Sequence, residues 1–386
     1  MDLATFERLL TDEGRALVAE VHARAGVESD LALGTRLRRE HDPALVAAAV
    51  TQNHLRSKAV AKFGPDAADL WFTHDALEQS TRHTVATARA ERLLDHGVPG
   101  VLDLGCSIGG DLLALARVGL RVRGVEQDPV RAAIARANLA ALGLDGEVST
   151  ADLAEVEARA DEVVFLDPAR RSGTGRVFDV EAMEPPWTLV TARLEERAVV
   201  KTMPGIEHRH LPDGVEAQWV SDGGDLVEAC LWSPDLATTS RRATLLPGPL
   251  ELTGDGSPAE VGPLGTWLHE PDDAVTRAGL VGALAQRLDA RLLDPHLAYL
   301  TSDGPSTDGL ARSFRVVEEL PYREKQLRAA LVARDVGTLT IKKRGVDVSP
   351  ERLVRRLRLD GSRTAVVVLA RVGSGARAFL VEPAGG

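Results

Sequence analysis

The sequence is poor in cysteine, and this scarcity excludes a disulfide framework. Its two cysteines, Cys106 and Cys230, also lack the spacing of metal ligands, so we expect no metal site. Long hydrophobic runs are missing too, because no uninterrupted apolar segment approaches the roughly 20 residues that span a bilayer. The N-terminus lacks a basic segment followed by an apolar core. We therefore expect a cytoplasmic protein with no membrane partner.

An overall excess of positive charge is also absent, because the formal net charge is −11. Taken over the whole chain, this value argues against a nucleic-acid partner. The charge is unevenly distributed, however. Residues 314–386 contain 15 Lys or Arg against 8 Asp or Glu, a local net charge of +7. Such asymmetry favours a polyanion partner for the C-terminal part, although an ordinary basic surface would have the same composition.

Residues 1–76 are predicted to be helical. Apolar side chains recur at steps of three and four residues, as at Phe6 and Leu10, and Pro43 can begin a further helix. Another helix is expected over residues 75–96. The chain of 386 residues is long enough for two to four domains. We interpret the helical first part, residues 1–76, as a cap on the domain that follows.

Short apolar strands alternate with helical segments over residues 98–234. This alternation is typical of a parallel sheet wrapped by helices. The last two strands surround the turn SDGGD and should form an antiparallel hairpin. The expected strands lie at residues 98–104, 122–126, 146–149, 162–166, 198–202, 216–220 and 227–232.

A connector and two small modules are expected to follow. Residues 233–263 are rich in Pro, Gly and Thr, which is typical of a connector. The first module has one expected helix, over residues 278–288. The second module has helices and strands. The helices are expected at residues 323–334 and 350–357, and the strands at 338–342, 365–372 and 378–381.

The stretch VLDLGCSIGGD, residues 101–111, is predicted to form a strand, a tight turn and the start of a helix. The apolar run ends in Asp103, and Gly105 and Gly109 can provide the unusual backbone angles of the turn. Glycine also lets a cofactor approach the backbone closely, because no Cβ atom intervenes.

Acidic residues follow the next strands as well. Glu126 ends the second expected strand, Asp152 follows the third, and Asp167 follows the fourth. The carboxyl ends of parallel strands meet at one edge of a sheet. We therefore expect these acids to lie with Asp103 on one rim.

The glycine turn and its ordered acids resemble the S-adenosylmethionine-binding pattern of class I methyltransferases, and the expected hairpin matches their sheet. The segment GTLTIKKRGVDVSPERLVRRLRL is similar to the THUMP-like domain found behind such enzymes, with a small ferredoxin-like module between them. The resemblance covers residues 75–386. It implies an α/β fold, in which a Rossmann-like seven-stranded methyltransferase sheet accompanies an N-terminal helical region and small α+β C-terminal domains. The implied domains are a helical cap (1–76), a class I methyltransferase domain (77–245), a connector with the ferredoxin-like module (246–317) and a THUMP-like basic domain (318–386).

S-adenosylmethionine carries an ammonium and a sulfonium group, so its site should present oxygen atoms. By resemblance, Asp103 and the glycine turn hold the amino-acid part, and Glu126 accepts both ribose hydroxyls. Asp152 accepts the adenine amino group, and Leu153 donates its backbone N–H. The cofactor-binding residues implied in this way are Asp103, Gly105, Cys106, Ser107, Gly109, Glu126, Gln127, Asp152, Leu153 and Asp167.

Two other interpretations of these acids stay open. Strand-end acids such as Glu126 and Asp152 can simply cap helices. An acid about 20 residues beyond a glycine turn is also the ribose signature of a nicotinamide dinucleotide site. Against this, Ser107 replaces the second glycine of that fingerprint, and Asp103 would face the like charge of the pyrophosphate.

The segment Asp167-Pro168-Ala169-Arg170 resembles the loop of methyltransferases that act on exocyclic amines, where the Asp accepts the amine hydrogens. The resemblance implies that Asp167, Pro168 and Arg170 are catalytic, and Arg170 could stack on a base or hold a phosphate. The loop also resembles that of RNA uridine C5 methyltransferases, which need a cysteine after the fifth strand. That strand end carries no cysteine, so a nitrogen or ribose oxygen acceptor is favoured. Lys201 stands there instead; it is expected to be exposed, and the alternative is that it orients a 2′-hydroxyl or a phosphate.

Clustered basic side chains in the last module fit phosphate contacts along folded RNA. Few aromatic residues accompany them, which favours backbone recognition over base stacking. A solvated basic helix is the alternative. The expected RNA-binding residues are Lys342, Lys343, Arg344, Arg352, Arg355 and Arg356.

The sequence therefore predicts an S-adenosylmethionine-dependent methyltransferase that acts on RNA, either ribosomal or transfer RNA. Two alternatives stay open: a methyltransferase that acts on a small molecule or protein, and a non-catalytic RNA-binding protein that holds S-adenosylmethionine.

Overall fold

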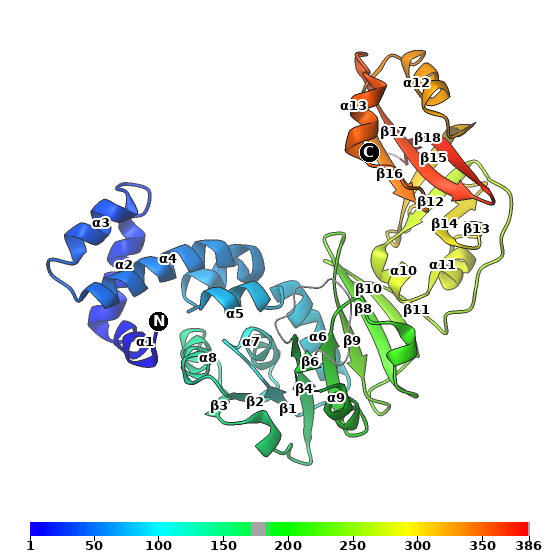
Figure 1. Cartoon of the computed structure of the whole chain (residues 1–386). Helices are drawn as coiled ribbons and strands as arrows, with labels where there is room; N and C mark the ends of the chain where they lie inside the picture. Colours follow the sequence, from blue (N-terminus) through cyan, green and yellow to red (C-terminus); the bar gives the residue numbers. More distant parts are fainter. Residues whose placement is uncertain (171–182, 185, 385–386) are drawn as a thin grey trace. The chain divides into compact units, whose positions relative to one another are not determined.

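The computed structural model describes residues 1–170, 183–184 and 186–384 (Figure 1). The chain forms two compact units. The first comprises Met1–Val215 and Cys230–Ala237, and the second comprises Glu216–Ala229 and Thr238–Gly386. Strand β9 (Asp225–Trp232) contributes to both units.

The first unit is organised around a parallel sheet. Its central strands, β1 (Gly100–Leu104) and β4 (Glu162–Leu166), are buried along their whole length, as their apolar sequences predict. Strand β1 pairs in parallel with β4 on one side and with β2 (Arg121–Glu126) on the other. The order in this unit is β9-β7-β4-β1-β2-β3, with β3 at Glu147–Thr150 and β7 at Ala198–Thr202. The expected α/β sheet is confirmed.

Helices precede the sheet and connect its strands. Most begin at a side chain that caps their free N–H groups; Asp42, for example, accepts from the N–H groups of Ala44 and Leu45. In the described part of the chain, no helix is both long and apolar enough to cross a membrane. The helices of this unit are α1 (Leu3–Leu9), α2 (Asp12–Arg24), α3 (Asp30–Leu37), α4 (Pro43–Phe63), α5 (His74–Gln79), α6 (His83–Asp95), α7 (Gly110–Arg117), α8 (Pro129–Ala141) and α9 (Trp187–Leu194).

The single helix expected over residues 75–96 is wrong, because the chain leaves the helical conformation between α5 and α6. The ammonium of Lys62 donates to the carbonyls of Leu77, Glu78 and Ser80, at 2.9, 2.5 and 2.8 Å. These carbonyls belong to the end of α5 and would otherwise lack partners. Lys62 on α4 thus stabilises the helix end and the bend that follows.

The N-terminal helices and the sheet share one hydrophobic core. The ring of Phe6 meets that of Trp71 edge to face, with centroids 5.8 Å apart. Both belong to the same buried cluster as Phe165 of β4 and Trp232 of β9. The helical region is therefore packed as part of the first unit.

The second unit begins with strands that continue the order β11-β10-β8-β9. Strand β8 (Glu216–Asp222) and β9 form the expected hairpin, with its turn at residues 223–224. The connector expected over residues 233–263 is wrong in part, because it contains β10 (Arg241–Leu246) and β11 (Leu250–Gly254). Strand β10 pairs in parallel with β8.

The rest of the second unit is a seven-stranded sheet with the order β13-β14-β12-β15-β18-β17-β16. The strands expected at residues 338–342, 365–372 and 378–381 therefore belong to one sheet with β12–β15, which were not predicted. Its elements are β12 (Trp267–Pro271), β13 (Arg291–Asp294), β14 (Leu297–Ser302), β15 (Ala311–Pro321), β16 (Val336–Arg344), β17 (Arg363–Val372) and β18 (Gly375–Pro383).

Four helices accompany this sheet. The helix expected over residues 278–288 is found as α11 (Val281–Arg287), which begins three residues later, and an unexpected short helix, α10 (Asp273–Arg277), precedes it. Gly279, between them, has a φ of +70°, a left-handed conformation that ends a helix. The other two are α12 (Glu324–Val332) and α13 (Pro350–Leu357), close to the expected positions.

Candidate functional site

The turn after β1 has the left-handed backbone that its glycines predict. Gly105 and Gly109 have φ values of +83° and +88°, and Ser107 has a φ of +51°. The backbone N–H groups of Gly105 and Cys106 both donate to the carbonyl of Val125 on β2, at 2.8 and 3.0 Å. The turn is therefore held against the neighbouring strand.

Glu126, the last residue of β2, is buried and oriented by the backbone. Its Oε2 accepts from the N–H of Ser107 at 3.0 Å, and its Oε1 accepts from the N–H of Asp128 at 2.9 Å. Each carboxylate oxygen keeps a further lone pair. Glu126 can therefore accept two hydroxyl groups from a ligand without losing the contacts that hold it.

Asp103 lies near the end of β1 and is 2% exposed. Its Oδ2 has no hydrogen-bond partner among the residues that the structure describes. Burial raises the pKa of the Asp103 carboxyl well above its usual range, and the nearby charges of Asp111 and Asp167 raise it further. A buried carboxyl oxygen without a partner is unfavourable. A cationic or hydrogen-bond-donating ligand would relieve this cost.

A buried ion pair lies beside Asp103. Arg89 on α6 donates to Asp111 on α7, and their side chains are only 4% and 13% exposed. The Thr81 hydroxyl donates to the other oxygen of Asp111 at 2.8 Å. Burial alone would raise the pKa of Asp111, but the charges of Arg89 and Lys201 and these hydrogen bonds lower it. Its surroundings therefore favour the ionised form of Asp111, whereas burial disfavours the ionised form of Asp103.

Lys201, at the end of β7, connects this ion pair to the loop after β4. Its ammonium donates to Asp167 Oδ2 at 2.5 Å and to the Thr81 hydroxyl at 3.0 Å. The Lys201 side chain is 15% exposed, so the expectation of an exposed lysine is wrong. Lys201 orients Asp167, which is 37% exposed and hence accessible to a ligand.

Thr81, Arg89 and Asp111 were not predicted as site residues from the sequence. A signal for Arg89 exists, because it occupies the apolar stripe of α6 between the buried residues Val85 and Leu93. A charged residue in such a stripe needs a buried partner. The partner itself could not be found from spacing, since Asp111 lies 22 residues away.

Asn138 of α8 connects the glycine turn to the N-terminal helical region. Its amide donates to the carbonyls of Ile108 and Trp71, at 2.9 and 3.1 Å, and accepts from the N–H of Trp71 at 2.7 Å. Gln52 of α4 makes a matching pair of hydrogen bonds with the backbone of Phe72. The chain at residues 71–72 is thus held from two sides.

The other expected cofactor residues lie either behind the glycine turn or on the surface. The Cys106 thiol is buried, and a Cβ atom on Gly124 would lie 2.8 Å from its sulfur, so the side chain packs behind the turn. Gln127 is exposed. Asp152 is exposed and caps a short 3₁₀ helix that starts at Leu153, with Oδ1 accepting from the N–H of Ala154 at 2.9 Å. Asp152 therefore caps a helix with one carboxylate oxygen, as the alternative interpretation expected.

The acceptor loop is described in part. Pro168 is half-buried and directly follows Asp167. The backbone of Arg170 lies in β5 (Ala169–Arg170), which pairs with β6 (Met183–Glu184). The side chain of Arg170 lies outside the described part of the structure.

Basic residues of the second unit differ in how they are engaged. Lys342 of β16 pairs with Glu270, and its ammonium lies 5.6 Å from the centroid of the Phe314 ring. Arg344 pairs with Asp273 at 3.3 Å. Lys343, between them, is exposed. Two of these three residues therefore hold elements of the unit together.

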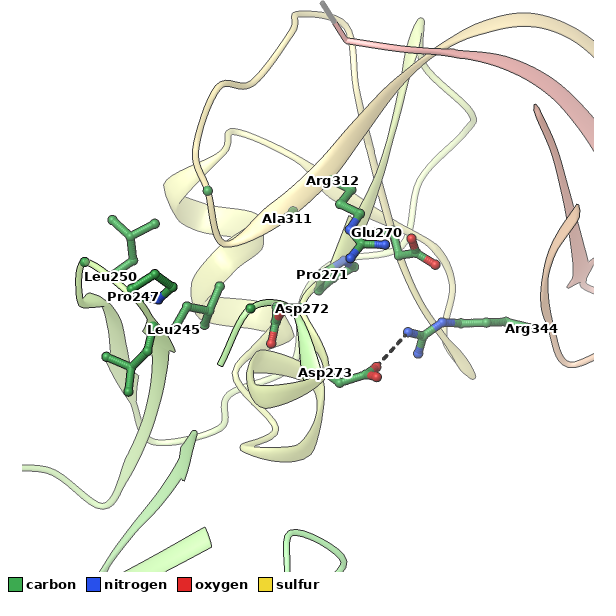
Figure 2. A pocket seen from close by; sticks show the side chains of 15 residues that line it. Leu245, Pro247, Leu250, Glu270, Pro271, Asp272, Asp273, Ala311, Arg312 and Arg344 are labelled. Atoms are coloured by element: carbon green, nitrogen blue, oxygen red, sulfur yellow. Dashed lines mark hydrogen bonds and ion pairs between the residues drawn. The ribbon is translucent and has the colours of Figure 1, made fainter. Parts of the chain in front are cut away.

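Arg344 also lines a pocket of about 440 Å³ in the second unit. Figure 2 shows the pocket, with the dashed ion pair between Arg344 and Asp273. Its other acids have partners as well: Glu270 pairs with Lys342, and Asp272 accepts from Ser221. The acids of this pocket thus serve the packing of the unit.

A second pocket of about 800 Å³ lies between α12 and α13. We call it the arginine pocket. Its lining contains five arginines and one acid: Arg328, Arg352, Arg355, Arg356, Arg358 and Glu324.

The first unit offers what a cationic, ribose-bearing cofactor requires. Asp103 presents a buried carboxyl oxygen that has no partner in the described part of the chain, and Glu126 presents two oriented acceptors. Gly105 and Gly109, which have positive φ, place no Cβ atom at their positions in the turn. S-adenosylmethionine, with its ammonium group and ribose hydroxyls, fits this donor and acceptor set.

Comparison with known proteins gives matches along the chain. A family model described as THUMP domain-like matches residues 311–383, and one described as a domain of unknown function (DUF8688) matches residues 2–59. The crystal structure of a provisionally assigned methyltransferase from Porphyromonas gingivalis W83 shares the fold, with a TM-score of 0.75 and 20% identity. The match covers 95% of this chain and 96% of the Porphyromonas gingivalis chain.

Two curated relatives come from Mycobacterium tuberculosis, strains CDC 1551 / Oshkosh and H37Rv. Each is named an uncharacterised S-adenosylmethionine-dependent methyltransferase and is 41% identical over 335 residues, which cover 83% of this chain and 91% of the relative. The chain therefore belongs to the S-adenosylmethionine-dependent methyltransferases, carries a THUMP-like domain at its C-terminus and uses S-adenosylmethionine as its cofactor.

Proposed function

We propose that this methyltransferase modifies RNA, either ribosomal or transfer RNA, at a nitrogen or a ribose oxygen. One observation carries the proposal for the acceptor. Asp167 directly follows β4, and its carboxylate is held by Lys201 of β7. It lies near the glycine turn and the buried Asp103. An oriented carboxylate at this place can accept a hydrogen from the amine or hydroxyl that receives the methyl group.

In this proposal the chain mainly positions the acceptor and excludes water. When bound, S-adenosylmethionine supplies an electrophilic methyl group on a sulfonium leaving group. Asp103 would hold the cofactor ammonium, Glu126 the ribose hydroxyls, and Asp152 with the Leu153 N–H the adenine. The backbone of residues 105–109 would follow the amino-acid part.

The two cysteines support a nitrogen or oxygen acceptor over a carbon acceptor. Carbon methylation of a pyrimidine needs a thiolate that adds to the ring. Cys106 and Cys230 are only 5% and 1% exposed. Burial also raises the pKa of the Cys106 thiol well above its usual range, which disfavours the reactive thiolate.

The C-terminal part supports RNA as the substrate class. Its THUMP-like domain carries the excess of basic residues, and its arginine pocket has five guanidinium groups against one carboxylate. Such a surface favours a polyanion.

The test is transfer of a labelled methyl group from S-adenosylmethionine into lysate from cells that lack this protein. Wild type is compared with Asp167→Ala and with the matched control Asp161→Ala. Asp161 lies before β4, at the other end of the strand, and is paired with Arg121 on the surface. Because the length of β4 separates Asp161 from the acceptor loop, we expect its variant to keep full transfer.

We expect label that RNase releases and that falls by about 100-fold or more in Asp167→Ala. Nucleoside mass spectrometry would then identify the methylated atom. Label found in protein or in small molecules would overturn the RNA proposal. Cofactor binding without any transfer would overturn catalysis and favour a binding protein.

A further inference from the structure

The arginine pocket concentrates positive charge on one small surface of the second unit. Its five arginines and Glu324 give a formal charge of +4. No aromatic or aliphatic residue lines it. A pocket of this composition can offer charge and N–H donors but no apolar contact.

The two helices that form the pocket are anchored from below. Leu327 and Leu331 on α12 and Leu353 and Leu357 on α13 are fully buried in one hydrophobic cluster. Because these apolar residues recur every four positions, the arginines of α13 are left on its outer face. The charged surface is therefore fixed by the packing of the helices.

Two of the guanidinium groups are oriented by neighbours. Arg328 donates through Nε to the carbonyl of Leu357 at 2.8 Å, which leaves its terminal N–H groups available. Arg356 makes two hydrogen bonds with the carboxylate of Glu324, at 3.1 and 2.5 Å. Glu324 thus neutralises one arginine and holds it in place.

The other three arginines, Arg352, Arg355 and Arg358, are exposed. None of them has an ion-pair partner within the described residues. Lys342 and Arg344, by contrast, are occupied by Glu270 and Asp273. Arg352, Arg355 and Arg358 therefore gather three unpaired charges in the arginine pocket, whereas Lys343 is the only charged residue of β16 that is exposed and has no ion pair among the described residues.

We propose that the arginine pocket binds backbone phosphates of RNA, an inference that rests on the proposed function. Guanidinium groups match the oxygens of a phosphate with two parallel hydrogen bonds. Without an aromatic residue the pocket cannot stack a base, so it would recognise the RNA backbone without reading its sequence. An acidic protein is the less suitable partner, because protein interfaces depend on apolar or aromatic anchors that this pocket does not provide.

The experiment measures binding of a fluorescein-labelled RNA hairpin to the full-length protein, between about 50 and 200 mM salt. The variant Arg352→Gln/Arg355→Gln removes two charges from the pocket. The matched control Lys325→Gln/Arg363→Gln removes two charges from exposed positions of the same unit that do not line it. Binding of S-adenosylhomocysteine to each protein confirms that the first unit remains folded, and circular dichroism monitors the second.

We expect the pocket variant to bind the hairpin about tenfold more weakly and to lose about 1.5 from the slope of log affinity against log salt. The control should change the affinity by less than about twofold. Equal losses in both variants would overturn the pocket, while the proposed function would stand on its own methyl-transfer test. Unchanged hairpin binding together with lost binding of poly-glutamate would overturn it in favour of an acidic protein.

Discussion

Charged side chains serve opposite purposes in the two units. In the first unit, Asp103 and Arg89 are buried and the Asp111 side chain is only 13% exposed; Arg89 pairs with Asp111, while Asp103 Oδ2 has no partner among the described residues. Arg352 and Arg355 of the second unit are exposed. A buried charge acts over a short range and is costly to leave unpaired, whereas surface charges act together and are screened by salt. Single substitutions in the first unit should therefore have large effects that salt hardly changes, and those in the second should have small, salt-dependent ones.

The largest effect is expected for Asp103→Asn. Loss of a buried carboxylate that pairs with the cofactor ammonium costs about 3 kcal/mol, so the affinity for S-adenosylmethionine should fall by about 100-fold. The variant should also have a free energy of unfolding about 1 kcal/mol higher, because it removes an unpartnered buried acid. It should therefore unfold at a higher urea concentration. Calorimetric titration and urea unfolding of the cofactor-free protein measure the two effects.

Asp111→Asn is the matched control for this prediction. It leaves Arg89 buried without its carboxylate, so it should destabilise the protein by about 3 kcal/mol. The same stability change in both variants would contradict the distinction between Asp103 and Asp111.

The next effect is expected for Lys201→Met, which removes the ammonium that orients Asp167. We expect methyl transfer to fall by about 30-fold, because a mispositioned group loses part of its contribution to the transition state. Lys201→Arg should restore much of the rate, since it keeps a charged donor. Single-turnover rates of the three proteins test this role, and a fall in cofactor affinity alone would contradict it.

A smaller effect concerns pH. Burial raises the pKa of Asp103 in the cofactor-free protein, and a bound cation favours its ionised form. Cofactor affinity should therefore rise with pH, by at most about tenfold per unit, and level off above the pKa of Asp103. The cofactor-free protein should change in the opposite sense. Its unfolded state binds fewer protons above about pH 4, so its stability falls as pH rises towards that pKa. Titrations of S-adenosylhomocysteine across pH measure the first trend, and Asp103→Asn should abolish it.

The smallest effect is expected for Lys342→Met. Because Lys342 is occupied by Glu270, its loss should weaken RNA binding by less than about twofold. Glu270 would keep no lysine partner, so the second unit should lose about 1 kcal/mol of stability. A tenfold loss of RNA affinity without a change in stability would move the RNA surface back to β16.

Much of the first unit could be predicted because its signals are local. The apolar runs of β1, β4 and β7 identify buried strands, and parallel pairing then brings Asp103, Glu126 and Asp167 to one edge. The strand β10 was missed because the segment around it is rich in Pro, Gly and Thr, and the strand itself begins with two arginines. One of these, Arg242, pairs with the buried Glu216, a contact that only the folded sheet defines.

The site was predictable to the extent that it follows strand ends. The partners Thr81, Arg89 and Lys201 come from separate elements, so spacing could not group them. Only part of the arginine pocket could be predicted from the sequence, for the same reason. Helical spacing brings Arg352, Arg355 and Arg356 to one face of α13, but Arg328 comes from another helix.

The shared strand β9 has a consequence for how the protein is made. The chain leaves the first unit after Val215 and returns to it only for Cys230–Ala237. Neither unit is therefore a continuous stretch of chain. On the ribosome, the first unit cannot acquire its last strand until the hairpin of β8 and β9 has been synthesised. For the same reason, no single cut in the gene separates the two units cleanly. A fragment of residues 1–237 contains the whole first unit but also carries residues 216–229 of the second.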